Sequence, residues 1–379
     1  MQGNKKKICF VVSGHDTWIV VQSMFEAAKE EQCFVVLLKY AYVDDSYYIH
    51  YMEKLKSQGV IVYYANEYRI EDDCPDVIVY CFDWHKYDGE EVSVAPENAR
   101  KFVKKIVMVP LDMVVYEGYG SIADVSRRYL RQYADMCFVN PDYYQKFKLY
   151  QKNLILEGNP KFDYIYRKLV KKSFSIPDTW RKKIGNKKVV MWATTHGLDN
   201  RHITPLYTFD IWAKDIIEYF IKHKEYVLLF RPTNRIFEDL ILSGVCSYDE
   251  CRNFEEMFKK EDNFILDNTP DYASAYKVSD MLLCPPNGML LSYLPTKKPI
   301  VYTTTYRMNY TFNDENLIRN YYVVKDKIDL TKAIDDIFIN GDPLYEKRMQ
   351  TLKQYVPHFD GKIGERIVKR MLCEIDDCS

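Results

Sequence analysis

The sequence predicts an α/β protein of two domains, each built on a parallel sheet covered by helices. Two observations predict this class. A chain of 379 residues exceeds one ordinary core at about 100–200 residues per domain, and short apolar runs alternate with amphipathic stretches along its length. A hydrophobic content of 47% with 28% charged residues is typical of a folded globular protein, and it excludes a disordered one.

The first half of the chain has the pattern of a doubly wound, Rossmann-like domain. Short apolar runs predict its strands, and the amphipathic stretches between them predict its helices. Strands are expected at residues 7–13, 33–39, 60–64, 76–82, 106–110 and 136–140, and helices near 17–30, 47–58, 97–104 and 122–133.

The alternation restarts after residue 186, which predicts a second Rossmann-like domain rather than one large sheet. Its strands are expected at 188–194, 226–231, 263–266, 280–284 and 300–303, and its helices at 207–223, at 271–278 and from 287. Beyond residue 329 the pattern is helical, and the last helix, 361–373, is expected to cross back and pack on both domains. The predicted division is 1–166 for the first domain, 167–187 for a linker, 188–360 for the second domain and 361–379 for a C-terminal helix and tail.

Charge and cysteine content exclude several classes of protein. The net charge of −1 gives no chain-wide field that would recruit nucleic acid, so no nucleic-acid partner is expected. The 10 cysteines are dispersed and several lie in apolar runs, which favours buried free thiols in a reducing compartment over a disulfide scaffold. No apolar run approaches the length of a membrane span, and no ligand spacing for a metal is present. We expect a cytoplasmic protein that contacts a membrane only at its surface and holds no metal.

The segment that joins the two domains is strongly basic. Residues 167–188 contain nine Lys or Arg and one acidic residue, a net charge of +8. One interpretation is a solvated linker, because charge runs commonly mark exposed segments. The other is a patch that docks on the anionic inner face of the cell membrane or on a polyanionic acceptor. The patch residues are Lys171, Lys172, Arg181, Lys182 and Lys183.

Polar residues follow four predicted strands of the second domain, at the edge where open α/β sheets bind ligands. Hydroxyls, an arginine and a helix start that converge there suit a pyrophosphate, because exposed N–H groups and cations neutralise its charge. Strand-to-helix turns with capping residues are the alternative. The residues predicted to bind the pyrophosphate are Thr194, Thr195, Gly197, Arg231, Thr233, Asn268, Thr269, Asn287 and Gly288.

Candidate catalytic residues lie at similar turns. In the first domain, 13–17, 82–85 and 110–112 follow strands and would line the opposing wall of a cleft. These turns offer a general base, for which Asp112 is the first choice and His15 the second, with His85 weaker. His196, after the first strand of the second domain, is a further catalytic candidate. The alternative for each is a helix cap or a packing residue.

A set of motifs in a fixed order carries a family resemblance. They are Trp18, Cys74-Pro-Asp-Val-Ile-Val-Tyr80, Glu157-Gly-Asn-Pro-Lys-Phe-Asp163, Trp192-Ala-Thr-Thr-His196, Arg231-Pro-Thr233, and Ser279-Asp280 through Lys298-Pro299-Ile300. In this order the chain resembles the CDP-glycerol glycerophosphotransferase family of teichoic acid and capsule polysaccharide synthesis, from about residue 8 to residue 303.

The resemblance implies a GT-B fold, in which two Rossmann-like domains face a cleft. It implies transfer of a glycerol phosphate, or a related alditol phosphate or sugar, from CDP-glycerol or a similar nucleotide-activated donor to a hydroxyl, with no cofactor. The acceptor would be a lipid-linked or polymeric polysaccharide or polyol phosphate held mainly by the N-terminal domain. The donor would bind the C-terminal one.

The sequence departs from the family at the donor site. Thr233-Asn234 replaces the usual His-Pro, and Pro285-Pro286-Asn287-Gly288 replaces Asp-x-Ser-Ser. Three alternatives therefore stay open beside the transferase: a GT-B glycosyltransferase, an enzyme related to nucleotide-sugar epimerases, and a binding or scaffold subunit whose donor site has been lost.

Overall fold

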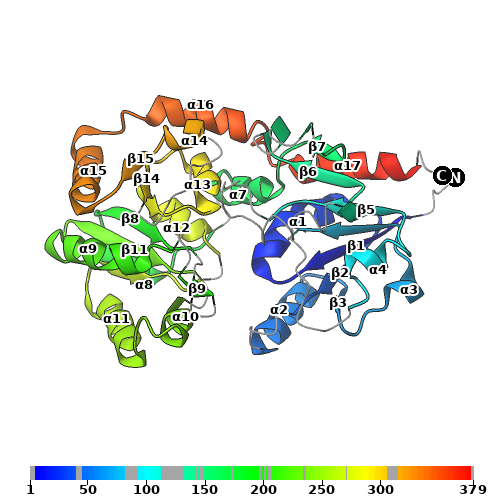
Figure 1. Cartoon of the computed structure of the whole chain (residues 1–379), viewed down its shortest axis with the longest axis horizontal. Coiled ribbons are helices and arrows are strands. Elements are labelled where there is room, and N and C mark those ends of the chain that lie inside the picture. Colours follow the sequence, from blue (N-terminus) through cyan, green and yellow to red (C-terminus); the bar gives the residue numbers. More distant parts are fainter. Residues whose placement is uncertain are drawn as a thin grey trace. The chain divides into compact units, whose positions relative to one another are not determined.

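A computed structural model divides the chain into two compact units (Figure 1). The first unit combines Met1–Arg167 with Lys353–Ser379, and the second is Lys168–Leu352. The segment predicted as a linker therefore belongs to the second unit, and the C-terminal helix to the first. The structure describes residues 5–39, 45–81, 92–111, 132–141, 144–145, 148–149, 151–171, 174–195, 198–199, 202–203, 207–233, 236–269, 271–304 and 315–376.

The first unit is built on a parallel sheet of seven described strands in the order β3-β2-β1-β4-β5-β6-β7. Their bounds are β1 Lys7–Val12, β2 Gln32–Leu37, β3 Val62–Tyr64, β4 Val77–Tyr80, β5 Lys105–Met108, β6 Met136–Val139 and β7 Leu154–Leu156. The central strands are runs of apolar residues because helices cover both faces of such a sheet. In β1 every residue after Lys7 is buried.

Helices from both ends of the first unit's sequence cover this sheet. They are α1 His15–Ala27, α2 Asp45–Ser57, α3 Ile70–Asp73, α4 Pro96–Ala99, α7 Lys161–Leu169 and α17 Ile363–Asp376. The C-terminal helix α17 packs against α1. A Cβ atom on Gly364 would lie 2.7 Å from the backbone nitrogen of Met24, so this close contact requires glycine.

The motif at 157–163 has a structural role in this packing. The buried carboxylate of Asp163 accepts hydrogen bonds from the N–H groups of Ile363 (2.9 Å) and Gly364 (2.7 Å) at the start of α17. Arg366 forms an ion pair with Glu157 at 2.6 Å. Burial raises the pKa of Asp163 although these N–H donors oppose the shift. The motif thus joins residues about 200 positions apart and fixes α17 in the first unit.

The second unit has a parallel sheet of six described strands in the order β12-β11-β8-β13-β14-β15. Their bounds are β8 Lys188–Ala193, β11 Tyr226–Arg231, β12 Phe264–Leu266, β13 Met281–Cys284, β14 Ile300–Thr303 and β15 Tyr322–Val324. A short antiparallel pair, β9 Leu198–Asp199 and β10 His202–Ile203, stands apart from this sheet.

Helices accompany this sheet, and the last of them runs beyond Leu352, where the unit ends. They are α8 Asp178–Ile184, α9 Phe209–Lys222, α10 Ile236–Leu242, α11 Tyr248–Lys260, α12 Ala273–Val278, α13 Met289–Ser292, η1 Leu294–Thr296, α14 Glu315–Ile318, α15 Lys327–Asn340 and α16 Tyr345–Tyr355. Trp192 of β8 stacks on Phe209 at 5.5 Å and lies 4.4 Å from Phe230. The core joins α9, α11 and α15 to one face of the sheet.

The predicted parallel sheets are confirmed, and several short or polar elements differ from the prediction. The strands β7 and β15 and the pair β9–β10 have at most three residues each, too few for a periodic pattern to show. Helices α10 and α11 fill a stretch left without prediction, although Ser247 and Glu250 form a capping box at the start of α11. Helix α8 lies inside the basic segment. The predicted helix at 122–133 lies almost wholly outside the described residues.

Candidate functional site

The strand order of the second unit places a topological switch point between β8 and β13. Connections leave these two neighbouring strands toward opposite sides of the sheet, so a crevice forms outside their carboxyl ends. The turns after β8, β11, β12 and β13 all lie at this edge because every pair in the sheet is parallel. The four predicted donor-binding motifs therefore share the carboxyl edge of one sheet.

Hydrogen bonds through Thr194 connect three of these turns. Its hydroxyl Oγ1 accepts from the N–H of Thr233 at 2.9 Å, and its carbonyl accepts from Nδ2 of Asn287 at 3.1 Å. The other amide atom of Asn287, Oδ1, accepts from the N–H of Met289 at 2.7 Å. Asn287 thus bridges the turns after the two strands of the switch point, and it also pairs the N–H of the first residue of α13.

An ion pair joins the turns after β11 and β12. Nη1 of Arg231 lies 2.6 Å from Oδ2 of Asp267, with side chains that are 12% and 0% exposed. Thr269 completes the pair: its N–H and hydroxyl donate to Oδ1 of Asp267 at 3.0 and 2.6 Å, and its carbonyl accepts from Arg231 at 3.1 Å. A buried carboxylate needs such partners, because an unpaired buried charge is strongly destabilising.

The guanidinium of Arg231 has N–H groups that the described part of the protein does not use. Within the described part of the chain its hydrogen bonds all use Nη1, so Nε and Nη2 stay open. Thr195, Thr233 and Gly288 are partly exposed at the same carboxyl edge, and Asn268 is exposed. A fixed cation with free N–H groups, surrounded by hydroxyls and amides, is the arrangement that binds phosphate oxygens.

Sequence reasoning predicted most of this cluster but missed one member. Eight of the nine predicted donor ligands lie at the carboxyl edge, whereas Gly197 falls outside the described residues, as does the catalytic candidate His196. Asp267, the partner of Arg231, was not among the predicted ligands. The signal was available, since an acidic residue directly follows a buried strand next to the one that ends in arginine.

The catalytic candidates of the first unit are only partly described. Asp112 and His85 lie outside the described residues. His15 begins α1 at the carboxyl end of β1, where its N–H donates to the hydroxyl of Tyr47 at 3.1 Å. The His15 ring makes an edge contact with Tyr164 at 6.3 Å between ring centres. This position suits either a helix-start residue or a base.

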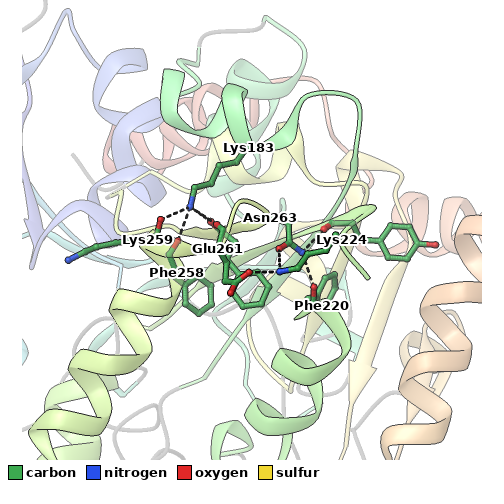
Figure 2. A network of polar contacts seen from close by, with 9 residues as sticks. Lys183, Phe220, Lys224, Phe258, Lys259, Glu261 and Asn263 are labelled. Atoms are coloured by element: carbon green, nitrogen blue, oxygen red, sulfur yellow. Dashed lines mark hydrogen bonds and ion pairs between the residues drawn. The ribbon is translucent and has the colours of Figure 1, made fainter. Parts of the chain in front are cut away.

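The structure separates Lys183 from the rest of the basic patch. Its Nζ donates to the carbonyls of Phe258 (2.8 Å), Glu261 (2.9 Å) and Phe264 (2.8 Å), where α11 ends and β12 begins (Figure 2). Burial lowers its pKa. Its hydrogen bonds therefore satisfy carbonyls where α11 ends, although burial disfavours the charge itself. The side chains of Lys171, Arg181 and Lys182 are exposed, and Lys172 lies outside the described residues.

Neither a metal-binding group nor a membrane-spanning helix occurs among the described residues. No group of three or more His, Cys, Asp or Glu side chains among them is arranged to hold a metal ion. None of the helices in the described ranges has the length and apolar character needed to span a bilayer.

Comparison with known proteins gives a family and a fold. The family model of CDP-glycerol:poly(glycerophosphate) glycerophosphotransferase matches residues 133–373. No curated protein matches the sequence.

Several solved structures share the fold over the whole chain. The complex of S. aureus MnaA with UDP has a TM-score of 0.67 and 15% identity, covering 98% of this chain and 97% of that one. UDP-GlcNAc 2-epimerase from Neisseria meningitidis, bound to UDP-GlcNAc, has a TM-score of 0.66 and 13% identity, covering 96% and 99%. A variant of the wall teichoic acid polymerase TagF soaked with CDPG has a TM-score of 0.58 and 14% identity, covering 100% and 91%. The predicted GT-B-like architecture is thereby confirmed.

Proposed function

Because this chain belongs to the CDP-glycerol:poly(glycerophosphate) glycerophosphotransferase family, we propose that it transfers a glycerol phosphate or related alditol phosphate from a CDP-activated donor. The acceptor is a hydroxyl of a cell-surface polymer or of a lipid-linked precursor. The observation that supports this most directly is the cluster of Arg231, Thr194 and Asn287 at the switch point of the second unit.

The donor pyrophosphate would lie at the carboxyl edge of the second sheet. Nε and Nη2 of Arg231 would donate to its oxygens, and the backbone around Gly288 would add N–H groups. Asp267 would hold the guanidinium in place, since the ion pair leaves only one side of it free. Such fixed donors stabilise the charge that develops on phosphate oxygens during transfer.

The reaction exchanges one P–O bond for another. The acceptor oxygen bonds to the phosphorus of the glycerol phosphate, the bond from that phosphorus to the CMP oxygen breaks, and CMP leaves. The hydroxyl proton passes to a base, for which Asp112, His15 and His196 remain our candidates. No metal or other cofactor is part of this proposal.

The test is CMP release from CDP-glycerol in the presence of a polyol phosphate acceptor. Arg231→Lys keeps a cation beside Asp267 but removes the second donor nitrogen, so donor affinity should fall about tenfold. The matched control is Lys183→Arg, which changes a cation at the opposite edge and should leave donor affinity unchanged. Equal donor affinity in Arg231→Lys and the parent would contradict the proposed donor position.

A sugar-nucleotide enzyme is the second candidate, because two of the similar structures are complexes with UDP or UDP-GlcNAc. Tighter binding of UDP sugars than of CDP-glycerol would favour it. Binding of a nucleotide without any turnover would instead favour a binding subunit.

We also propose that the exposed cations Lys171, Arg181 and Lys182 attach the protein to the inner face of the cell membrane.

A further inference from the structure

Two neighbouring cations at the start of the basic segment have partners in different units. Both lie in α7, where Arg167 ends the first stretch of the first unit and Lys168 begins the second unit. Nη1 of Arg167 lies 2.5 Å from Oε2 of Glu26 in α1. Nζ of Lys168 lies 2.9 Å from Oδ2 of Asp271, in the turn between β12 and α12. Lys168 is therefore tied to a turn at the carboxyl edge of the second unit's sheet.

The carboxylate of Asp271 is held at both oxygens. Oδ2 pairs with Lys168, and Oδ1 accepts from the N–H of Ala273, the first residue of α12, at 2.8 Å. The side chains of Lys168 and Asp271 are 23% and 28% exposed. Because both are largely withdrawn from water, salt screens this ion pair less than an exposed one. Lys168 thus fixes Asp271 at the start of α12.

Thr269 connects Asp271 to the buried carboxylate of Asp267. The hydroxyl Oγ1 of Thr269 lies 3.0 Å from the carbonyl oxygen of Asp271 and 2.6 Å from Oδ1 of Asp267. The N–H of Thr269 donates to the same Oδ1 at 3.0 Å. A hydroxyl has one proton, so the two acceptors share it and both bear on where Thr269 lies. Loss of the Asp271 contact would leave Thr269 held from the Asp267 side alone.

The carbonyl of Thr269 reaches the guanidinium of Arg231. It accepts from Nη1 at 3.1 Å, and the same nitrogen lies 2.6 Å from Oδ2 of Asp267. A guanidinium is planar, and a single contact to one nitrogen leaves its plane free to turn about that contact. The second contact, from Thr269, fixes the plane. The direction in which Nε and Nη2 of Arg231 point therefore depends on Thr269.

We propose that Lys168 positions the guanidinium of Arg231. It acts through Asp271 and Thr269 and is thus a positioning residue. The effect of Lys168 on the donor rests on the proposed function. The coupling between Lys168 and Arg231 does not, because every contact that carries it is formed within the second unit.

The test that needs no ligand is hydrogen exchange of the Thr269 and Ala273 amides in the full chain. Lys168→Met frees Asp271, so exchange should become about three- to tenfold faster at both amides. Coupling is reciprocal, so Arg231→Lys should also speed up exchange at Ala273. A structural role confined to the start of α12 would change the Ala273 amide alone, and this result would overturn the proposal.

The neighbouring cation supplies the matched control. Arg167→Met removes the same charge one position earlier in α7 and should leave both amides as in the parent. Lys168→Arg keeps a cation for Asp271 and should restore the parent exchange rates. Asp271→Asn breaks the ion pair from the other side while keeping an acceptor for Ala273, so it should speed up exchange at Thr269 even if Lys168→Met does not fold. Equal effects of Arg167→Met and Lys168→Met would overturn the proposal, because the contact with Asp271 would then not matter.

Donor binding gives the second readout. In a calorimetric titration with CDP-glycerol, Lys168→Met should raise Kd about three- to tenfold without changing the stoichiometry. Lys168→Arg and Arg167→Met should keep the parent Kd. A role of Lys168 in folding alone would lower the number of binding sites and leave Kd unchanged, which contradicts the positioning role.

The two proposals can fail separately. A protein that binds no CDP-activated donor, but shows faster exchange at both amides in Lys168→Met, would contradict the proposed function and leave the coupling to Arg231 in place. A folded Lys168→Met variant that binds CDP-glycerol with the parent Kd would contradict the positioning role alone.

Discussion

The two edges of the second unit's sheet use cations in opposite ways. At the amino edge, Lys183 donates to carbonyls at the end of α11 (Figure 2), and Lys298 donates to the carbonyls of Tyr276 (2.8 Å), Lys277 (2.9 Å) and Ser279 at the end of α12. At the carboxyl edge, Arg231 is held through one nitrogen by a buried carboxylate.

The difference lies in the donors that remain. An ammonium group has three N–H bonds, and each of these lysines donates them to backbone carbonyls at and just after the end of a helix. A guanidinium has five, and Arg231 has donors left after Asp267 and Thr269 are satisfied. The lysines, whose N–H groups are all used, pair carbonyls within the fold, whereas Arg231 has N–H groups available to a ligand.

Removing the guanidinium should have the largest effect, since it leaves Asp267 buried without a partner. We expect Arg231→Ala to lower the free energy of unfolding by about 3–5 kcal/mol and to abolish measurable donor binding. Urea unfolding and nucleotide titration would measure the two losses. The double variant Arg231→Met with Asp267→Asn should recover most of the stability and none of the binding. Recovery of both would mean that Arg231 serves the fold alone.

Lys183→Met should lower the free energy of unfolding by about 2 kcal/mol, because the carbonyls at the end of α11 lose a charged donor. Donor affinity should stay the same, because the substitution lies at the other edge of the sheet. Comparing urea unfolding with nucleotide titration checks both statements. A loss of donor binding in a stable Lys183→Met protein would break the contrast between the edges.

The lowered pKa of Lys298 predicts that the free energy of unfolding depends on pH. Burial lowers its pKa to about 8, from an ordinary value of 10.5. Between these values the unfolded chain binds more protons than the folded one, so this lysine makes the folded state more stable as pH rises. The slope is at most about 1.4 kcal/mol per pH unit. Urea unfolding from pH 7.5 to 10 should show this rise in the parent relative to Lys298→Met, and parallel curves would contradict the lowered pKa.

A smaller effect is expected at Asn287, which bridges β8 and β13. Asn287→Asp keeps the acceptor for Met289 but loses the donor to Thr194, at a cost of about 1 kcal/mol. The new negative charge should also weaken nucleotide binding. Asn287→Ser is the uncharged comparison. Equal nucleotide affinity in all three proteins would place the donor away from the switch point.

The exposed basic side chains should give the smallest change per residue. Each of Lys171, Arg181 and Lys182 should contribute about 1 kcal/mol to attachment to anionic vesicles at low salt. Single Gln variants should therefore sediment less with vesicles, and high salt should release the parent as well. Lys183→Gln is the matched control, and it should behave as the parent does. Sedimentation that does not depend on salt would exclude the patch.

The sequence allowed prediction of the parallel sheets, because buried strands such as β8 and β11 are continuous apolar runs. The clustering of Thr194, Arg231 and Asn287 followed, since the carboxyl ends of parallel strands meet at one edge. Pairings across sequence could not be predicted this way. Arg231 and Asp267 lie 36 positions apart, and no periodic pattern connects them.

Charge runs were equally ambiguous in sequence. Lys182 and Lys183 are neighbours of the same type, yet one is exposed and the other reaches the end of α11. The rotation of α8, set by its buried Trp180, decides which lysine faces the protein. The sequence also did not predict that α17 belongs to the first unit, because its hydrogen-bond partner Asp163 lies 200 residues away.

The first unit is interrupted by the second along the chain, and this affects synthesis on the ribosome. Residues 5–167 emerge first, but the partner of Asp163 and the helix that covers α1 emerge only after residue 364. At about 5–20 residues per second, the nascent first unit waits some ten seconds or more with the α1 face that α17 will cover exposed to solvent. The second unit, contiguous in sequence, has no such delay. The order of emergence therefore favours completion of the second unit before the first.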